Sequence, residues 1–143
     1  MALVDAALAG AEGEDLDRRS QGGWSARMVV HHLADSEANS YVRLRRLLAE
    51  PSGSLLQGYD EAAWARSAEL GYQDRDLQPS LAVFRAVRAA SSELLERLRE
   101  ADFERAGIHE ESGRYTVRDW LRIYAAHAEE HADQIRRARR GEP

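Results

Sequence analysis

One stretch near the C-terminus, residues 116–135, constrains the fold of this chain most strongly. Its apolar residues recur every three or four positions, which is the spacing of one face of an α-helix. That face consists of Val117, Leu121, Tyr124, Ala128 and Ile135. Thr116 and Asp119 stand at the spacing of a capping box, in which the two residues satisfy the first backbone N–H groups of a helix. We therefore predict a helix that begins after Thr116 and buries one side.

Two histidines, His127 and His131, lie on the flank of this predicted face. At about 100° per residue, His131 is roughly 40° and His127 roughly 80° from its centre, on the same side. Imidazoles four residues apart on a helix can bind one metal ion, because their Cβ atoms are only about 6 Å apart. They can equally be core histidines that are satisfied by hydrogen bonds. The pair alone does not decide between these two interpretations.

The rest of the chain also favours helices. Ala, Leu, Glu and Arg are abundant, β-branched residues are scarce, and Gly and Pro are clustered. The length of 143 residues suits a single domain over residues 1–143. We predict an all-α fold, an up-and-down four-helix bundle with a short first helix and one extra short helix. Its helices are expected over residues 2–10, from 25 to about 49, at 59–65, from Pro79 onward, and after Thr116. Residues 69–78 and 101–115 are expected to be connections.

The second long helix, with Ser25 as its expected N-cap, carries two adjacent histidines and an inward acid. His32 is nearer the apolar face of this helix, whereas His31 is nearly opposite and is expected at the surface. Glu37 falls near the centre of the apolar face, where an unpaired carboxylate would be costly. Glu37 is therefore a candidate metal ligand, a proton-transfer group, or one half of an ion pair with an arginine from another segment.

Composition excludes several classes of function. The net charge of -5 gives no general case for nucleic-acid binding. Without cysteine, the chain has no disulfide, no thiolate metal ligand and no thiol nucleophile of its own. No stretch has the length and apolarity of a membrane span, and no leader pattern is present, so the cytoplasm is the expected location.

Three segments, residues 22–37, 59–64 and 121–131, resemble the DinB-like superfamily, and its YfiT-like branch in particular. The resemblance implies a four-helix bundle that binds one divalent metal ion through three histidines. Carried over to this sequence, they are His32, His127 and His131, the same residues that helical periodicity turns inward. Zinc or nickel is the expected ion, although imidazoles also bind iron and copper and the sequence does not name the metal.

The resemblance further implies an enzyme, either a metal-dependent hydrolase or a thiol S-transferase of the bacillithiol or mycothiol type. Three imidazoles leave one coordination position open for water or for a small-molecule thiol. Glu37 is the preferred candidate for orienting a ligand or transferring a proton. The alternative is a non-catalytic metal-binding or ligand-binding module, associated with stress response or DNA damage. His127 to His131 also matches H-x-x-E-H, but Glu130 projects to the polar face, which disfavours a zinc protease.

This sequence departs from the resemblance at its N-terminus, where roughly nine residues stand in for a longer first helix. A homodimer that supplies the missing surface is therefore expected. The other expected partner is a small-molecule substrate, with no nucleic acid and no membrane. His109 falls in the predicted connection 101–115 and is expected at the surface.

Overall fold

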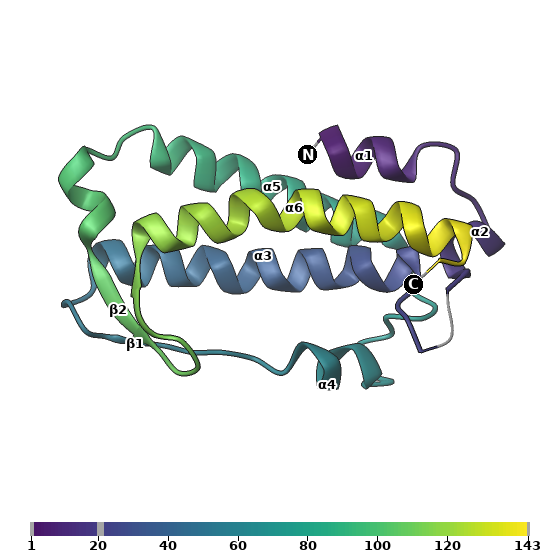
Figure 1. Cartoon of the computed structure of the whole chain (residues 1–143), viewed down its shortest axis with the longest axis horizontal. Coiled ribbons are helices and arrows are strands. Elements are labelled where there is room, and N and C mark those ends of the chain that lie inside the picture. Colours follow the sequence, from purple (N-terminus) through teal and green to yellow (C-terminus); the bar gives the residue numbers. More distant parts are fainter. Residues whose placement is uncertain (1, 20–21, 143) are drawn as a thin grey trace.

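The computed structural model describes residues 2–19 and 22–142. Four helices form the bundle in Figure 1: α1 (Ala2–Leu8), α3 (Ala26–Ala49), α5 (Leu77–Leu95) and α6 (Val117–Arg140). Two short helices, α2 (Glu14–Asp17) and α4 (Glu61–Arg66), and one 3-10 turn, η1 (Glu100–Glu104), lie in the connections. The predicted four-helix bundle is confirmed, including its short first helix and the extra short helix α4, but its helices do not alternate strictly up and down, because α3 and α5 run in the same direction.

The helices begin where side chains satisfy the first free N–H groups. The Ser25 side chain accepts a hydrogen bond from the N–H of Met28, and Asp60 accepts one from the N–H of Ala63. At the start of α6, the capping box of Thr116 and Asp119 is present in both directions. Helix α5 begins at Leu77, two residues earlier than Pro79 suggested, because Asp76 caps it. Pro79 fits there because first-turn N–H groups have no partner within the helix.

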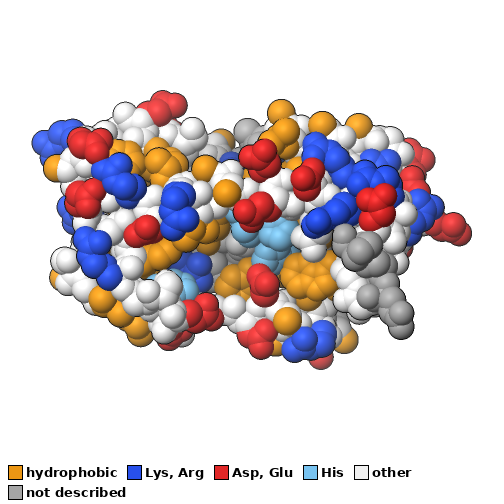
Figure 2. All heavy atoms as spheres, in the orientation of Figure 1, with side chains coloured by type: hydrophobic (Ala, Val, Ile, Leu, Met, Phe, Trp, Pro, Cys, Tyr) orange, Lys and Arg blue, Asp and Glu red, His pale blue; other side chains and the backbone are white. Residues whose placement is uncertain are grey.

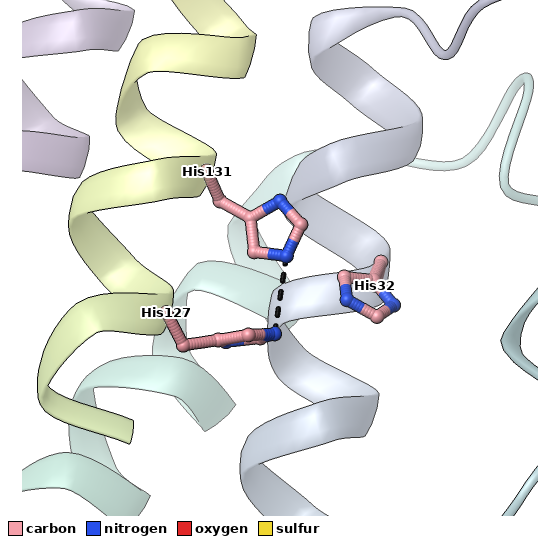
Figure 3. Close-up of side chains that lie close together, drawn as sticks. All are labelled: His32, His127 and His131. Carbon is pink, nitrogen blue, oxygen red and sulfur yellow. Dashed lines mark hydrogen bonds between the residues drawn. The ribbon is translucent and has the colours of Figure 1, made fainter. Parts of the chain in front are cut away.

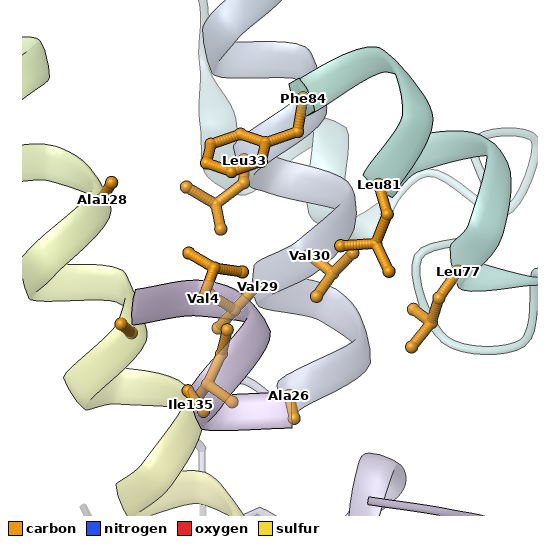
Figure 4. Close-up of a cluster of buried hydrophobic side chains, with 12 residues drawn as sticks. Val4, Ala26, Val29, Val30, Leu33, Leu77, Leu81, Phe84, Ala128 and Ile135 are labelled. Atoms are coloured by element: carbon orange, nitrogen blue, oxygen red, sulfur yellow. The ribbon is translucent and has the colours of Figure 1, made fainter. Parts of the chain in front are cut away.

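Helix α3 is the centre of the bundle, with α5 and α6 packed against it and α1 packed against α6. The largest buried apolar cluster lies where these four helices meet, and Figure 4 shows Val4, Leu33, Phe84 and Ile135 pointing into it. A second cluster, around Leu44 and Trp120, fills the other end of α3 and α6. Glu37 and His127 fall between these two clusters along α3 and α6, whereas His32 and His131 lie at the level of the first cluster.

The connection from α3 to α5, residues 50–76, runs back along the outside of the bundle. As the colours of Figure 1 show, α3 and α5 therefore run in the same direction, and α6 runs against both. Helix bundles accommodate such long crossovers as well as short hairpin connections. The crossover matters for the site because it carries α4 and the residues just before it across the face of α3.

A small sheet, absent from the sequence-based prediction, closes one end of the bundle. Strand β1 (Leu55–Leu56) pairs in parallel with β2 (Ala106–His109), and β2 pairs antiparallel with β3 (Gly113–Thr116). The segment expected as a plain connection is thus a hairpin that leads into α6. Within the described part of the chain, no helix is long and apolar enough to cross a membrane.

Candidate metal centre

Three imidazole rings meet between α3 and α6, as Figure 3 shows. His32 comes from α3, and His127 and His131 come from successive turns of α6. One ring nitrogen of each residue lies within 4.8 Å of the other two, and the Nε2 atoms of His127 and His131 are 3.1 Å apart. Ligand nitrogens on a tetrahedral zinc ion are separated by about 3.4 Å, given Zn–N bonds of about 2.1 Å. The separation of the two α6 nitrogens is therefore close to that in a metal centre, and a ring nitrogen of His32 lies within 4.8 Å of both.

Neighbouring side chains hold the rings in this orientation. The Nδ1 atom of His131 donates a hydrogen bond to Oε1 of Gln134 at 2.6 Å, which leaves its Nε2 lone pair facing the other two rings. The hydroxyl of Tyr59 lies 3.4 Å from Nδ1 of His32, and the Trp24 ring packs edge-on against His32 with centroids 5.1 Å apart. Fixing one ring nitrogen so that the other is free is how proteins prepare histidines for metals.

The three histidines are electrically neutral near pH 7. Burial lowers the pKa of His32 to about 4, with a smaller contribution from His131. Burial also lowers the pKa of His127 to about 3, helped by His131, His32 and Arg88. The pKa of His131 is lowered by burial, against the opposing effects of Gln134, Glu61 and Glu130. Neutral imidazole is the form that binds a metal ion.

The donor set fits a divalent metal ion of the zinc, nickel, iron or copper group. Its atoms are all imidazole nitrogens, which these ions prefer and which magnesium and calcium do not. The Nδ1 atom of His127 is buried and has no hydrogen-bond partner among the described residues. His32, His127 and His131 are thus the residues that would hold the ion. Their role as ligands stays a prediction.

Glu37 is buried in the middle of α3, only 1% exposed, but its partners are not the histidines. Its Oε1 accepts a hydrogen bond from Nε of Arg88 at 2.7 Å, and Nη2 of the same arginine donates to the backbone carbonyl of Tyr124. From the sequence, three roles are open for Glu37. The structure shows the third of them, an ion pair with an arginine of another helix, Arg88 on α5. Burial nevertheless raises the pKa of Glu37, against the effect of Arg88.

His31 is not at the surface, contrary to the expectation from periodicity. It is 2% exposed, its Nδ1 lies 2.8 Å from Oγ of Ser80, and the ring of Tyr72 packs beside it. The crossover and the start of α5 cover the side of α3 that a simple two-face picture assigns to solvent. His109 is also more buried than expected, at 8% exposure, because β2 turns it inward.

A cavity of about 760 Å³ opens beside His127 and extends to the sheet. Its walls come from α3, the crossover, the β2–β3 hairpin and α6, and they include Arg43, Tyr59, Glu61, His109 and Tyr124. Figure 2 shows the pale-blue histidine surface at the bottom of a hollow with acidic side chains around it. A small molecule in this cavity would reach the histidines from the solvent side.

Three residues of the centre, Tyr59, Glu61 and Gln134, did not emerge from the sequence-based search. Glu61, the first residue of α4, has an Oε2 atom 3.7 Å from Nε2 of His32. Gln134 follows His131 by three positions and so faces it on the helix, a signal that spacing alone could have supplied. Tyr59 and Glu61 lie on the crossover, whose path across α3 has no local sequence signal.

Comparison with known proteins places the chain among its relatives. The sequence profile of the DinB superfamily matches residues 2–135. A protein of Oceanobacillus iheyensis named "Putative metal-dependent hydrolase" is 37% identical over 114 residues, which are 80% of this chain and 64% of that protein. A Bacillus licheniformis protein of the same description is 36% identical, over 96% of this chain and 78% of its own length.

A solved structure shares the fold. It is YfiT from Bacillus subtilis, described as "a probable metal-dependent hydrolase with an unusual four-helix bundle topology". The two structures agree with a TM-score of 0.87 at 31% sequence identity, over 99% of this chain and 82% of that one. In sequence, this chain spans less than two thirds of two relatives, 64% of the O. iheyensis protein and 63% of YfiT.

Proposed function

Because this chain belongs to the DinB superfamily, we propose that it binds one divalent metal ion through His32, His127 and His131 and uses it to hydrolyse a small-molecule substrate. The observation that carries the proposal is the convergence of three imidazole nitrogens within 4.8 Å of one another, at the edge of a cavity. The names of the relatives add support, since they describe metal-dependent hydrolases.

The ion would lower the pKa of a water or thiol bound at the open position and so supply an anionic nucleophile near neutral pH. The side chains around it have separate tasks. Gln134 keeps the Nε2 lone pair of His131 directed at the ion through the hydrogen bond to Nδ1. Trp24 packs edge-on against the ring of His32 and covers part of its surface. The cavity beside His127 leaves the opposite side accessible to substrate.

Thiol S-transfer is the second candidate reaction. The chain has no cysteine, so any thiol nucleophile must come from a small molecule. The cavity of about 760 Å³ is large enough for a thiol cosubstrate and an electrophile together. The two reactions separate in one assay, because hydrolysis proceeds without added thiol and S-transfer does not.

Metal content by elemental mass spectrometry, on protein purified without an affinity tag, tests the ligand set. We expect about one equivalent of metal in the wild type, and its loss in His32→Ala and in His131→Ala. His31→Gln is the matched control, because it removes an adjacent imidazole outside the centre and should keep the metal. Wild-type protein that stays free of metal after incubation with zinc and nickel would contradict the proposal.

Turnover then separates an enzyme from a non-catalytic metal-binding module of stress response or DNA damage. Fully loaded protein is assayed with esters and amides, and with thiol plus electrophile. An enzyme shows metal-dependent turnover that His127→Ala abolishes. Full metal occupancy without turnover over a broad panel would favour the non-catalytic alternative.

We also propose that the protein is a homodimer. Helix α1 packs along the C-terminal half of α6, where Arg139 donates to the Ala7 carbonyl, and a groove between α5 and α6 that includes Leu95 and Leu121 stays open toward the start of α6. Leu121 is 37% exposed there, and a second copy could cover it. Light scattering coupled to size exclusion should give twice the mass of the 143-residue chain. A stable monomer at micromolar concentration would refute the dimer.

A further inference from the structure

We propose that Glu61 makes this site selective for substrates that carry a positive charge within a few bonds of the reacting atom. The inference rests on the proposed function, because it concerns what occupies the open position beside the three histidines. It goes further by naming the chemical class of that occupant and the residue that selects it.

The first observation is the place of Glu61. Its Oε2 lies 3.7 Å from Nε2 of His32, so the carboxylate borders the position on which the imidazole nitrogens converge. The crossover holds it there, because Asp60 caps α4 and fixes Glu61 as its first residue. The Glu61 side chain is 60% exposed and lines the cavity, so it meets anything that enters from solvent.

The second observation is that Glu61 has no cationic partner. Among the residues that the structure describes, its one close basic neighbour is His32, one of the three histidines that would hold the ion. Two other acids of the cavity walls, Glu110 and Glu111, lie beside Gly58, where Glu110 accepts a hydrogen bond from the backbone N–H. Beside the three histidines, Glu61 therefore carries a negative charge that no arginine of the described residues pairs with.

The cation of the same cavity, Arg43, lies toward the other end. Its guanidinium donates to the carbonyl of Gln57 and to the hydroxyl of Tyr124, and not to Glu61. Glu61 thus lies next to the reacting position without a guanidinium group against it. A ligand with an ammonium group close to its reacting atom matches this arrangement, whereas an anion there meets Glu61 directly.

Any test must separate the effect of the metal ion's charge on ligand binding from the effect of the Glu61 charge. Two thiols allow this, because they differ in one charge and hardly in shape: thiocholine, with a quaternary ammonium group, and 3,3-dimethylbutane-1-thiol, its uncharged carbon analogue. Neither distal group can bind the metal. The ratio of their dissociation constants, compared between wild type and Glu61→Gln, cancels the effect of the ion, which is common to both proteins.

Binding is measured on cobalt-loaded protein by the thiolate-to-cobalt charge-transfer absorption. We expect Glu61→Gln to reduce the preference for thiocholine over its analogue by about tenfold, the effect of one unit charge at a few ångströms in a partly exposed site. Glu61→Asp, which keeps the charge, should retain most of the preference. Glu93→Gln, at an exposed position of α5 away from the cavity, should change nothing.

Two failures can be distinguished. If both thiols bind and the ratio is the same in wild type and in Glu61→Gln, the selectivity assigned to Glu61 is wrong and the metal centre stands. If cobalt binds but neither thiol produces the absorption, the open position itself is absent. The proposed function then fails, and this inference falls with it.

Discussion

At the scale of single residues, the orientation of two of the three imidazoles depends on one neighbour each. Gln134 holds Nδ1 of His131, and Tyr59 lies against Nδ1 of His32. A freely rotating histidine must lose conformational entropy when it binds an ion, so a ring that is already held binds more tightly.

This dependence gives a prediction for Gln134→Leu. The substitution removes the acceptor for Nδ1 of His131 and should weaken zinc binding by about 10- to 100-fold, while all three histidines stay in place. Competition with a chromophoric chelator measures the change. Gln78→Leu, at an exposed position of α5, is the control and should bind zinc like the wild type.

Glu37 is connected to the site through its ion pair with Arg88. Arg88 joins α5 to Glu37 on α3 and to the carbonyl of Tyr124, one turn before His127 on α6. We therefore expect Glu37 to act on the site by positioning α6 rather than by touching substrate.

Arg88→Met should destabilise the protein by about 3–5 kcal/mol in urea unfolding, because it leaves the Glu37 carboxylate buried without a partner. Adding Glu37→Gln should restore part of the loss, since the buried charge is then gone. Equal stability of the wild type and the single variant would show that the pair is dispensable.

At the scale of elements, the small sheet depends on close approach of two strands at Gly107. A Cβ atom there would lie 2.8 Å from the carbonyl oxygen of Ser54 and 2.9 Å from Cγ of Leu56. Gly107→Ala should therefore cost about 1–3 kcal/mol of folding free energy, measured by thermal or urea unfolding. In Gly58→Ala the new methyl meets the flexible side chain of Glu111 at 3.2 Å, so this control should lose about 0.5 kcal/mol or less.

The helices could be predicted from the sequence and the sheet could not, for physical reasons. Helix α6 has a capping box and a periodic apolar face, which are local signals. Strands β2 and β3 have four residues each, and β1 has two, too few for a two-residue period to stand out. The pairing of β1 with β2 is also long-range, since Leu56 opposes His109, although β2 and β3 form a local hairpin.

The residues of the candidate site also divide into those that local sequence patterns predict and those that they do not. His32, His127 and His131 follow from helical periodicity together with the family resemblance, because all three lie on long helices. Glu61 and Tyr59 lie on the crossover, whose position over α3 depends on the packing of the whole bundle. The burial of His31, which periodicity placed at the surface, has a related cause: Tyr72, from the same crossover, packs beside its ring.

At the scale of the whole molecule, a metal ion would join α3 to α6 through side chains of both. Zinc at one hundred times its dissociation constant should stabilise the fold by about 2.7 kcal/mol. For a domain of this size, that corresponds to a rise in melting temperature of about 5–10 °C. Differential scanning calorimetry with and without zinc measures it. His32→Ala keeps the pair on α6 and should show a much smaller rise, whereas an equal rise would place the ion elsewhere.

The spacing of the three histidines also sets an order in time. His127 and His131 are one turn apart, so α6 can present them as soon as it becomes helical, whereas His32 joins only after distant parts of the chain have come together. An ion added to the folded protein meets three donors at once. An ion present during refolding meets only the two histidines of α6 at first. The time of its addition therefore decides whether it binds to α6 before the bundle has formed or joins α3 to α6 after folding is complete.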